Sequence, residues 1–235
     1  MASDPSLVER FEATYRQVAE AMSRSTTAGG PVHVVAATKK QPVASINAYI
    51  AWCRRKHIPV LIGENYVQEF KRKKTELQIY DQAHLLGALQ SNKVSMAVRL
   101  FDVIQSVHTV QILEAIFEQC TRQRRRLSVF LQVNVSGDPG KAGFAPEQLV
   151  ELLPLARSCP WVTLQGLMTI TRLYETPEQA RPDFKRMREL RGALGWPAAE
   201  LSMGMSSDFP IAIEEGATHV RIGTALFGER GIVAA

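Results

Sequence analysis

Eight short apolar segments recur along the chain, and a stretch with helical spacing of apolar residues follows or precedes each one. The predicted strands cover residues 33–39, 58–63, 84–89, 102–107, 127–135, 162–170, 200–205 and 219–226. The predicted helices between them cover residues 43–57, a stretch from about 67, 93–101, 109–123, 145–159, 176–195 and 206–216. Apolar strands that alternate with helices indicate a parallel sheet covered on its outer face. Eight such units close naturally into a TIM-type (β/α)8 barrel.

A doubly wound open sheet shares this alternation of strands and helices and is the main alternative. No GxGxxG pattern follows the first predicted strand, and eight strands in 235 residues match the usual length of a barrel. Residues 5–25 carry apolar side chains at helical spacing ahead of the first strand. We therefore expect a single α/β domain over residues 1–235, a (β/α)8 barrel with an extra N-terminal helix.

The composition indicates a globular protein rather than a membrane protein. Hydrophobic residues make up 46% of the chain, and no stretch approaches the roughly 18 uninterrupted apolar residues that a membrane span needs. The opening segment, MASDPSLVERFEATYRQ, has no apolar core and does not resemble a signal or transit peptide. Cys53, Cys120 and Cys159 stand singly, without the spacing of a disulfide framework or a metal site, and should pack in helices. We expect a cytoplasmic protein with no membrane contact and no bound metal.

Two basic clusters concentrate the net charge of +5, at residues 71–74 and 122–126. Both lie in or beside predicted helices, and neither has the interleaved aromatic residues or the motif of a nucleic-acid-binding domain. Solvated helix faces explain the clusters better than a nucleic-acid footprint, so we expect no specific nucleic acid. Binding of a small anionic ligand, or docking of a regulatory protein on the basic helices, remains an open alternative.

Polar residues collect at the carboxyl ends of the predicted strands, where barrel enzymes place their functional groups. These sets are Thr38–Lys40, Gly63–Tyr66, Gln90–Lys93, Asn134–Gly137, Met168–Ile170, Gly204–Asp208 and Arg221–Thr224. The last two follow strands seven and eight, where loops of small and hydroxyl residues often bind phosphate. A simple helix cap by Ser206 or Ser207 is the structural alternative, and both can hold at once.

A lysine pair, Lys39 and Lys40, closes the first predicted strand. Because side chains alternate along a strand, only one of the two can face the barrel mouth. Partial desolvation of an amine favours its neutral, nucleophilic form, which is the form that makes a Schiff base. Two solvated lysines are the ordinary alternative, but a phosphate site across the same mouth favours a functional lysine.

An ordered set of motifs resembles the YggS/PROSC-type pyridoxal phosphate homeostasis proteins, whose fold is related to the barrel domain of alanine racemases. The motifs run from about residue 33 to residue 228. They are AATKKQP, IGENYVQE, HLLGALQSNK, VNVSGDPGKAGF, GLMTI, LSMGMSSDF and VRIGTALFGER. Ala88 stands where the family usually has proline, and ATKKQP is a looser version of VSKTKP. These departures affect local backbone stiffness more than the implied ligand contacts.

The resemblance implies pyridoxal 5'-phosphate (PLP) as the cofactor. Aligned on Pro42, the cofactor lysine of the family falls on Lys39, which would hold PLP as a Schiff base, while Lys40 would face away. By the same alignment, Asn65 would lie beside the phenolic oxygen of the ring and Met168 would pack near the ring face.

The resemblance also implies a phosphate site and a partner for the pyridine nitrogen. Ser206, Gly223 and Thr224 would bind the phosphate, and Arg221 looks like the group opposite the ring nitrogen. A guanidinium has no acceptor, so it discourages protonation of that nitrogen and weakens the ring as an electron sink.

The function implied is a PLP carrier or regulator in PLP (vitamin B6) homeostasis, with little or no turnover and no catalytic residues. Alanine racemases take a second acid/base from an added β domain and a partner subunit, for which we expect no room here. A minimal amino-acid racemase, with Lys39 on one ring face and water or Tyr66 on the other, is the alternative. We expect a monomer, with PLP-dependent apo-enzymes or a regulatory protein as candidate partners.

Overall fold

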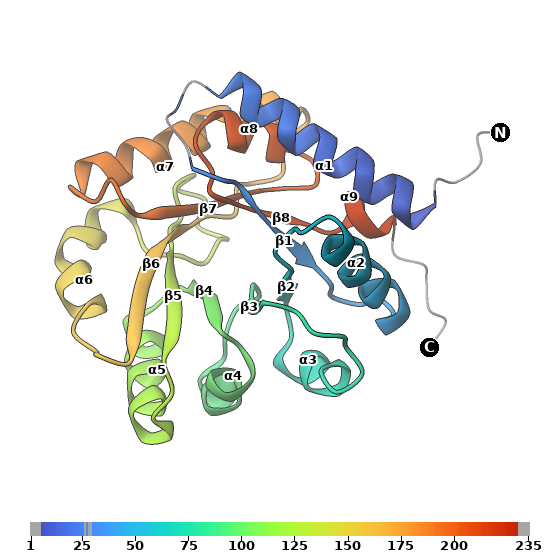
Figure 1. Cartoon of the computed structure of the whole chain (residues 1–235). Helices are drawn as coiled ribbons and strands as arrows, with labels where there is room; N and C mark the ends of the chain where they lie inside the picture. Colours follow the sequence, from blue (N-terminus) through green and yellow to red (C-terminus); the bar gives the residue numbers. More distant parts are fainter. Residues whose placement is uncertain (1–5, 26, 28–29, 230–235) are drawn as a thin grey trace.

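The computed structural model describes residues 6–25, 27 and 30–229, and eight parallel strands there close into one barrel (Figure 1). The strands are β1 (His33–Ala37), β2 (Leu61–Glu64), β3 (Gln82–Leu85), β4 (Val103–Val107), β5 (Leu127–Gln132), β6 (Val162–Met168), β7 (Glu200–Met205) and β8 (His219–Ile222). Strand β1 pairs with both β2 and β8, in parallel, which closes the ring. The (β/α)8 barrel predicted from the sequence is therefore confirmed.

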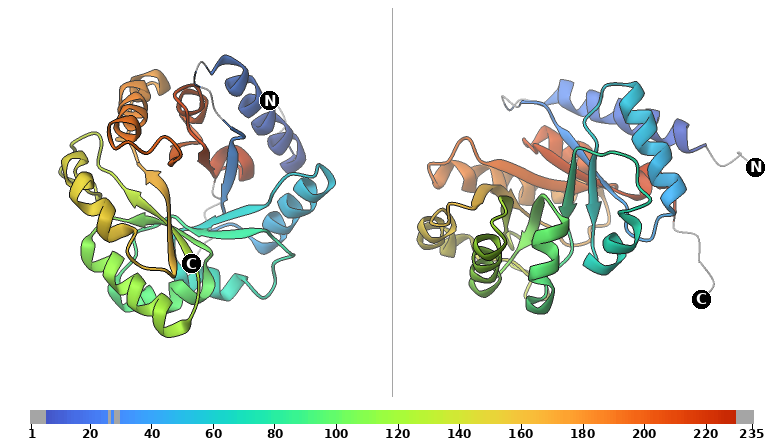
Figure 2. Two further views of the ribbon diagram at one scale, coloured as in Figure 1. Left: turned by 60° about the vertical axis from the view of Figure 1, so that its left-hand side comes forward. Right: turned by 60° about the horizontal axis from the view of Figure 1, so that its bottom comes forward.

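Helices surround the barrel on its outer side (Figure 2). They are α1 (Leu7–Arg24), α2 (Val43–Arg55), α3 (Val67–Lys73), α4 (Val94–Leu100), α5 (Val110–Gln123), α6 (Leu149–Ala156), α7 (Arg181–Ala193), α8 (Phe209–Glu214) and α9 (Thr224–Phe227). Three 3-10 turns, Ser91–Lys93, Pro146–Gln148 and Pro177–Ala180, lead into α4, α6 and α7. The main apolar core fills the layer between the strands and these helices.

The extra N-terminal helix, α1, is confirmed and covers one side of the barrel. Ser6 caps it in a capping box with Glu9, which satisfies backbone N–H groups of the first turn. Its buried Phe11 meets the rings of Tyr49 in α2 and Phe227 in α9 edge to face. The helix thus holds the first and last helical elements of the barrel together.

Strand β8 is shorter than predicted. The sequence predicted a strand over residues 219–226, but β8 ends at Ile222 and Thr224–Phe227 form α9. The cause is a side chain from another loop: the Ser206 hydroxyl accepts hydrogen bonds from the backbone N–H groups of Gly223 and Ala225. This long-range contact ends the strand at a place where the apolar pattern of the sequence alone predicts that it continues.

The other boundaries agree with the predicted order to within a few residues, and the predicted strands 127–135 and 162–170 end earlier, at Gln132 and Met168. The three cysteines are free and buried; Cys53 and Cys120 pack in helices, whereas Cys159 follows the end of α6. Within the described residues, no helix combines the length and apolar character needed to cross a membrane.

Candidate functional site

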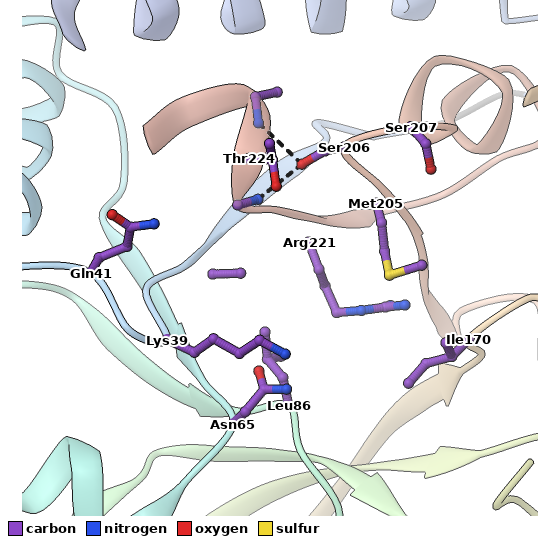
Figure 3. Close-up of a pocket in the computed structure, with 13 residues that line it drawn as sticks. Lys39, Gln41, Asn65, Leu86, Ile170, Met205, Ser206, Ser207, Arg221 and Thr224 are labelled. Atoms are coloured by element: carbon purple, nitrogen blue, oxygen red, sulfur yellow. Dashed lines mark hydrogen bonds between the residues drawn. The ribbon is translucent and has the colours of Figure 1, made fainter. Parts of the chain in front are cut away.

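A cavity of about 620 Å³ opens among the loops at the carboxyl ends of the strands. Figure 3 draws its lining, which is Ala37, Lys39, Gln41, Asn65, Leu86, Ile170, Met205, Ser206, Ser207, Arg221, Gly223, Thr224 and Ala225. These residues come from the ends of β1, β2, β3, β6, β7 and β8. The volume falls in the range of about 300–1,000 Å³ that small-molecule sites occupy.

Lys39 enters this cavity and Lys40 does not. Ala37 and Lys39 line the cavity, whereas Thr38 between them is buried against Glu64, on the outer side of the barrel wall. The alternation of β1 therefore continues past its last residue, and it leaves the next side chain, Lys40, exposed. Figure 3 shows the Lys39 side chain extending past Asn65 toward Leu86.

Hydroxyl groups lie on the opposite side of the cavity from Lys39 (Figure 3). The Ser206 Oγ accepts the backbone N–H groups of Gly223 at 3.1 Å and Ala225 at 3.2 Å, which ties the β7 loop to the β8 loop. Its own hydroxyl hydrogen is left to donate. The hydroxyls of Ser207 and Thr224 also line the cavity. Together they can donate several hydrogen bonds to an anion.

A glycine shapes the turn that carries Ser206. Gly204 has a φ of +91°, and a Cβ at this position would lie 2.5 Å from the Cβ of Ala212. Only glycine meets both conditions without strain. The residue that precedes α8 as its N-cap is Asp208, so neither Ser206 nor Ser207 caps this helix. The simple helix-cap alternative is therefore wrong, and the serines face the cavity.

Arg221 lies across the floor of the cavity and is nearly buried, with 5% of its surface exposed. Its Nη1 donates to the Ser202 Oγ at 2.8 Å and its Nη2 donates to the Thr169 carbonyl at 2.7 Å. Burial lowers the pKa of Arg221 to about 10, and nearby Asp208 opposes this shift. The guanidinium therefore stays charged at neutral pH and is fixed in orientation.

A chain of hydrogen bonds inside the barrel supports Arg221 from behind. The Ser202 Oγ donates to the Gln105 Oε1 at 2.6 Å, and the Gln105 Nε2 lies 2.9 Å from the His84 Nδ1. Burial lowers the pKa of His84 to about 3, so its ring is neutral and its Nδ1 accepts from Gln105. The orientation of Arg221 thus depends on three further side chains, which we call the interior relay: Ser202, Gln105 and His84.

Asn65 is placed by a close approach of two loops. A Cβ on Gly87 would lie 2.3 Å from the carbonyl oxygen of Asn65, so the chain can pass here only as glycine. The contact fixes the backbone at Asn65, whose side chain lines the cavity, as does that of Lys39 (Figure 3). Leu86 and Ile170 supply apolar surface to the same cavity.

Comparison with known proteins identifies the family. A family model described as the alanine racemase N-terminal domain matches residues 16–231. A pyridoxal phosphate homeostasis protein of Aquifex aeolicus is 37% identical over 227 residues, which are 94% of this chain and 97% of that protein. The chain belongs to the pyridoxal phosphate homeostasis family. The resemblance found in the sequence is thereby confirmed.

Solved structures of this family have the same fold. PipY of Synechococcus elongatus, solved without PLP, matches with a TM-score of 0.81 and 35% identity, over 95% of this chain and 100% of that one. PipY solved with PLP bound matches with a TM-score of 0.79 and 33% identity over the same shares. The barrel described above is therefore the barrel of this family.

Six of the seven site residues predicted from the sequence line the one cavity: Lys39, Asn65, Ser206, Arg221, Gly223 and Thr224. Met168 does not line it. That side chain is fully buried with Val103 and Phe130, and Ile170, two residues further on, reaches the cavity instead. Tyr66, the residue considered as a second acid/base, is 54% exposed and is not part of the lining either.

Sequence reasoning missed the interior relay behind Arg221. Its signal was present, because Gln105 and Ser202 are polar residues with apolar neighbours inside predicted strands. A buried polar side chain requires a partner, so two such residues in one barrel indicate a hydrogen-bond chain. What the sequence does not give is the strand order and register that bring them together.

Proposed function

We propose that this chain binds PLP in the cavity at the carboxyl end of the barrel, as a Schiff base on Lys39, and that it serves PLP homeostasis with little or no turnover. The observation that carries the proposal is the placement of one amine and one set of hydroxyl donors on opposite sides of a single cavity (Figure 3). Membership of the pyridoxal phosphate homeostasis family supports it, and so does the PLP-bound structure of PipY.

The residues present fit PLP in charge and in size. Ser206, Ser207 and Thr224 offer hydroxyl donors for a phosphate, while Lys39 and Arg221 make the cavity positive. When bound, PLP supplies an aldehyde carbon that condenses with a lysine amine and releases water. Lys39 is the lysine that would provide this amine, since Lys40 points out of the cavity.

Arg221 favours binding over turnover. Its guanidinium carries donors only, so a ring nitrogen placed against it must accept a hydrogen bond and stay unprotonated. An unprotonated pyridine withdraws electron density from the substrate carbon less strongly than a pyridinium does. The hydrogen bonds to Ser202 and Thr169 prevent Arg221 from turning aside. This arrangement suits a protein that holds PLP rather than one that uses it.

A minimal racemase is the alternative function, and the lining of the cavity argues against it. Racemisation needs a proton donor on the face of the ring opposite Lys39. Among the described residues that line the cavity, Lys39 and Arg221 are the titratable ones, and Arg221 is held by the interior relay. Incubation of the purified protein with single amino-acid enantiomers separates the two functions, because stereochemical exchange at enzymatic rates would reject the carrier.

The matched pair Lys39→Ala and Lys40→Ala tests the proposal. The protein mixed with PLP should turn yellow, and borohydride reduction followed by peptide mass spectrometry should place the pyridoxyl group on Lys39. Lys39→Ala should stay colourless, whereas Lys40→Ala should colour as the unmodified protein does, because Lys40 is exposed. Label on Lys40, or an uncoloured unmodified protein in excess PLP, would refute the proposal.

A further inference from the structure

A partly buried ion cluster lies behind the loop that carries Lys39, on the outer side of the barrel wall. Its centre is Lys73, the last residue of α3, whose side chain is 13% exposed. The Lys73 Nζ donates to the Glu69 Oε1 at 2.6 Å, to the Glu64 Oε1 at 3.0 Å and to the Thr38 carbonyl oxygen at 2.9 Å. The cluster therefore joins helix α3 to the peptide that precedes Lys39.

The same cluster holds the peptide that follows Lys39. The Glu69 Oε1 that accepts from Lys73 also accepts the backbone N–H of Lys40. One ion pair on α3, Glu69 with Lys73, thus binds the carbonyl on one side of Lys39 and the N–H on the other. Both peptide groups that set the direction of the Lys39 side chain are fixed from outside the cavity.

The backbone at Lys40 depends on this contact. Lys40 has a φ of +59°, a left-handed conformation that residues other than glycine rarely adopt. A side chain at such a position is retained when surrounding contacts determine the backbone, as the Glu69 hydrogen bond does here. Residues 38–40 therefore hold a specific shape in the absence of any ligand.

Glu64 adds a reason why Lys73 cannot move. Glu64 is fully buried, its Oε1 accepts from Thr38 Oγ1 at 2.9 Å, and its Oε2 has no hydrogen-bond partner among the described residues. Burial raises the pKa of Glu64, and the charge of Lys73 opposes that rise. Loss of Lys73 would leave a buried carboxyl group without its counter-charge, so the cluster is held as a unit.

We propose that Glu69 and Lys73 are positioning residues for Lys39: they fix both peptide groups beside it, so that its amine points into the cavity before a ligand arrives. The inference rests on the proposed capture of PLP by Lys39. Neither residue lines the cavity, so any effect they have on capture passes through the Lys39 backbone. Preorganisation of this kind raises affinity, because no part of the binding free energy is then needed to order the loop.

The test uses three variants of the full chain and one matched control. Glu69→Ala removes the acceptor for the Lys40 N–H and leaves the Glu64–Lys73 pair in place. Glu69→Gln retains an acceptor oxygen and should rescue the effect. Glu64→Gln/Lys73→Met removes the central cation without leaving a buried charge unpaired. Lys71→Met makes the same change at an exposed lysine of the same helix.

The first readout is amide hydrogen exchange in the protein without PLP. Loss of the charge-assisted hydrogen bond to Glu69 should raise the exchange rate of the Lys40 amide about tenfold or more in Glu69→Ala. Glu64→Gln/Lys73→Met should have a similar effect, because the Glu69 carboxylate and the Thr38 carbonyl then lose the Lys73 bonds that hold them in place. Lys71→Met and Glu69→Gln should stay near the unmodified protein. Equal protection of the Lys40 amide in all variants would overturn the proposal.

The second readout is the PLP concentration that gives half-maximal trapping on Lys39 by borohydride. It should rise about tenfold in the same two variants and stay unchanged in Lys71→Met. Faster exchange at Lys40 without weaker trapping would also overturn the proposal, because the cluster would then be structural only. If the unmodified protein traps no PLP, the proposed function fails, and the amide exchange alone decides whether the cluster fixes the Lys39 backbone.

Discussion

The substitution Ser202→Ala tests the interior relay that supports Arg221. Ser202 is fully buried in β7, where its hydroxyl accepts from the Arg221 Nη1 at 2.8 Å and donates to the Gln105 Oε1 at 2.6 Å. Alanine fits the same space and keeps the strand, so the change removes these two hydrogen bonds and little else. Gln105 would lose a partner inside the barrel, where it is fully buried, and Arg221 would lose one at the floor of the cavity.

The magnitude follows from the two bonds. A hydrogen bond to a charged group contributes about 1.5–3 kcal/mol, and a buried acceptor left unpaired costs about 1–3 kcal/mol. The two ranges add to about 2.5–6 kcal/mol of unfolding free energy, and the lower half applies, because Arg221 retains its bond to the Thr169 carbonyl and borders the cavity. That is a large part of the roughly 5–15 kcal/mol that stabilises a typical domain.

Equilibrium urea unfolding without PLP measures this loss, provided that the transition is two-state. The control is Ser158→Ala, an exposed serine whose hydroxyl donates to the Leu155 carbonyl, and its change should stay within about 0.5 kcal/mol. With PLP added, Ser202→Ala should also shift the absorption spectrum, because Arg221 can then turn away from the ring. A loss below about 1 kcal/mol would mean that the relay does not hold Arg221, and the argument from its geometry would be refuted.

Two further predictions concern pH and loop packing. Burial lowers the pKa of His84 to about 3, so below about pH 6.5 the unfolded chain takes up a proton that the folded protein does not. Stability should therefore fall between pH 7 and pH 5, by about 2 kcal/mol from this ring alone, and His84→Gln should reduce that fall by the same amount in urea titrations at the two pH values. Gly87→Ala, whose Cβ would lie 2.3 Å from the Asn65 carbonyl oxygen, should lower the free energy of unfolding by about 1–3 kcal/mol and weaken PLP binding. Gly192→Ala, in open space on α7, should not destabilise the protein. Equal melting temperatures for the two variants would contradict the packing argument.

The sequence predicted the parts of the fold and site that local pattern controls. Apolar runs separated by helical spacing gave the order of strands and helices, because burial on both faces leaves a continuous apolar strand. Strand alternation gave the opposite orientations of Lys39 and Lys40, and the structure shows that this alternation continues past Ala37. For these features, neighbours in the chain supply the decisive constraint.

The features that it did not predict depend on distant partners. Helix α9 forms where Ser206 accepts backbone N–H groups of the β8 loop, and Met168 is drawn into a cluster with Val103 and Phe130. The basic run at 71–74 read as a solvated face, yet Lys73 lies in the ion cluster and Lys74 donates to the Leu100 carbonyl. The i, i+4 spacing of Glu69 and Lys73 was the available signal, but it does not reveal the Thr38 carbonyl as a third partner.

The two basic side chains of the cavity, Lys39 and Arg221, are approached by separate networks on opposite sides of the barrel wall. Lys39 is held from outside, through peptide groups bound by Glu69 and Lys73, whereas Arg221 is held from inside through Ser202. The hydrogen bonds described for the two networks have no residue in common. Under the proposed function, a site whose side chains are fixed in this way would bind an anionic aldehyde with little rearrangement. The same fixed arrangement would favour retention of PLP over turnover, because proton exchange with a substrate needs a suitably placed acid or base on each face of the ring.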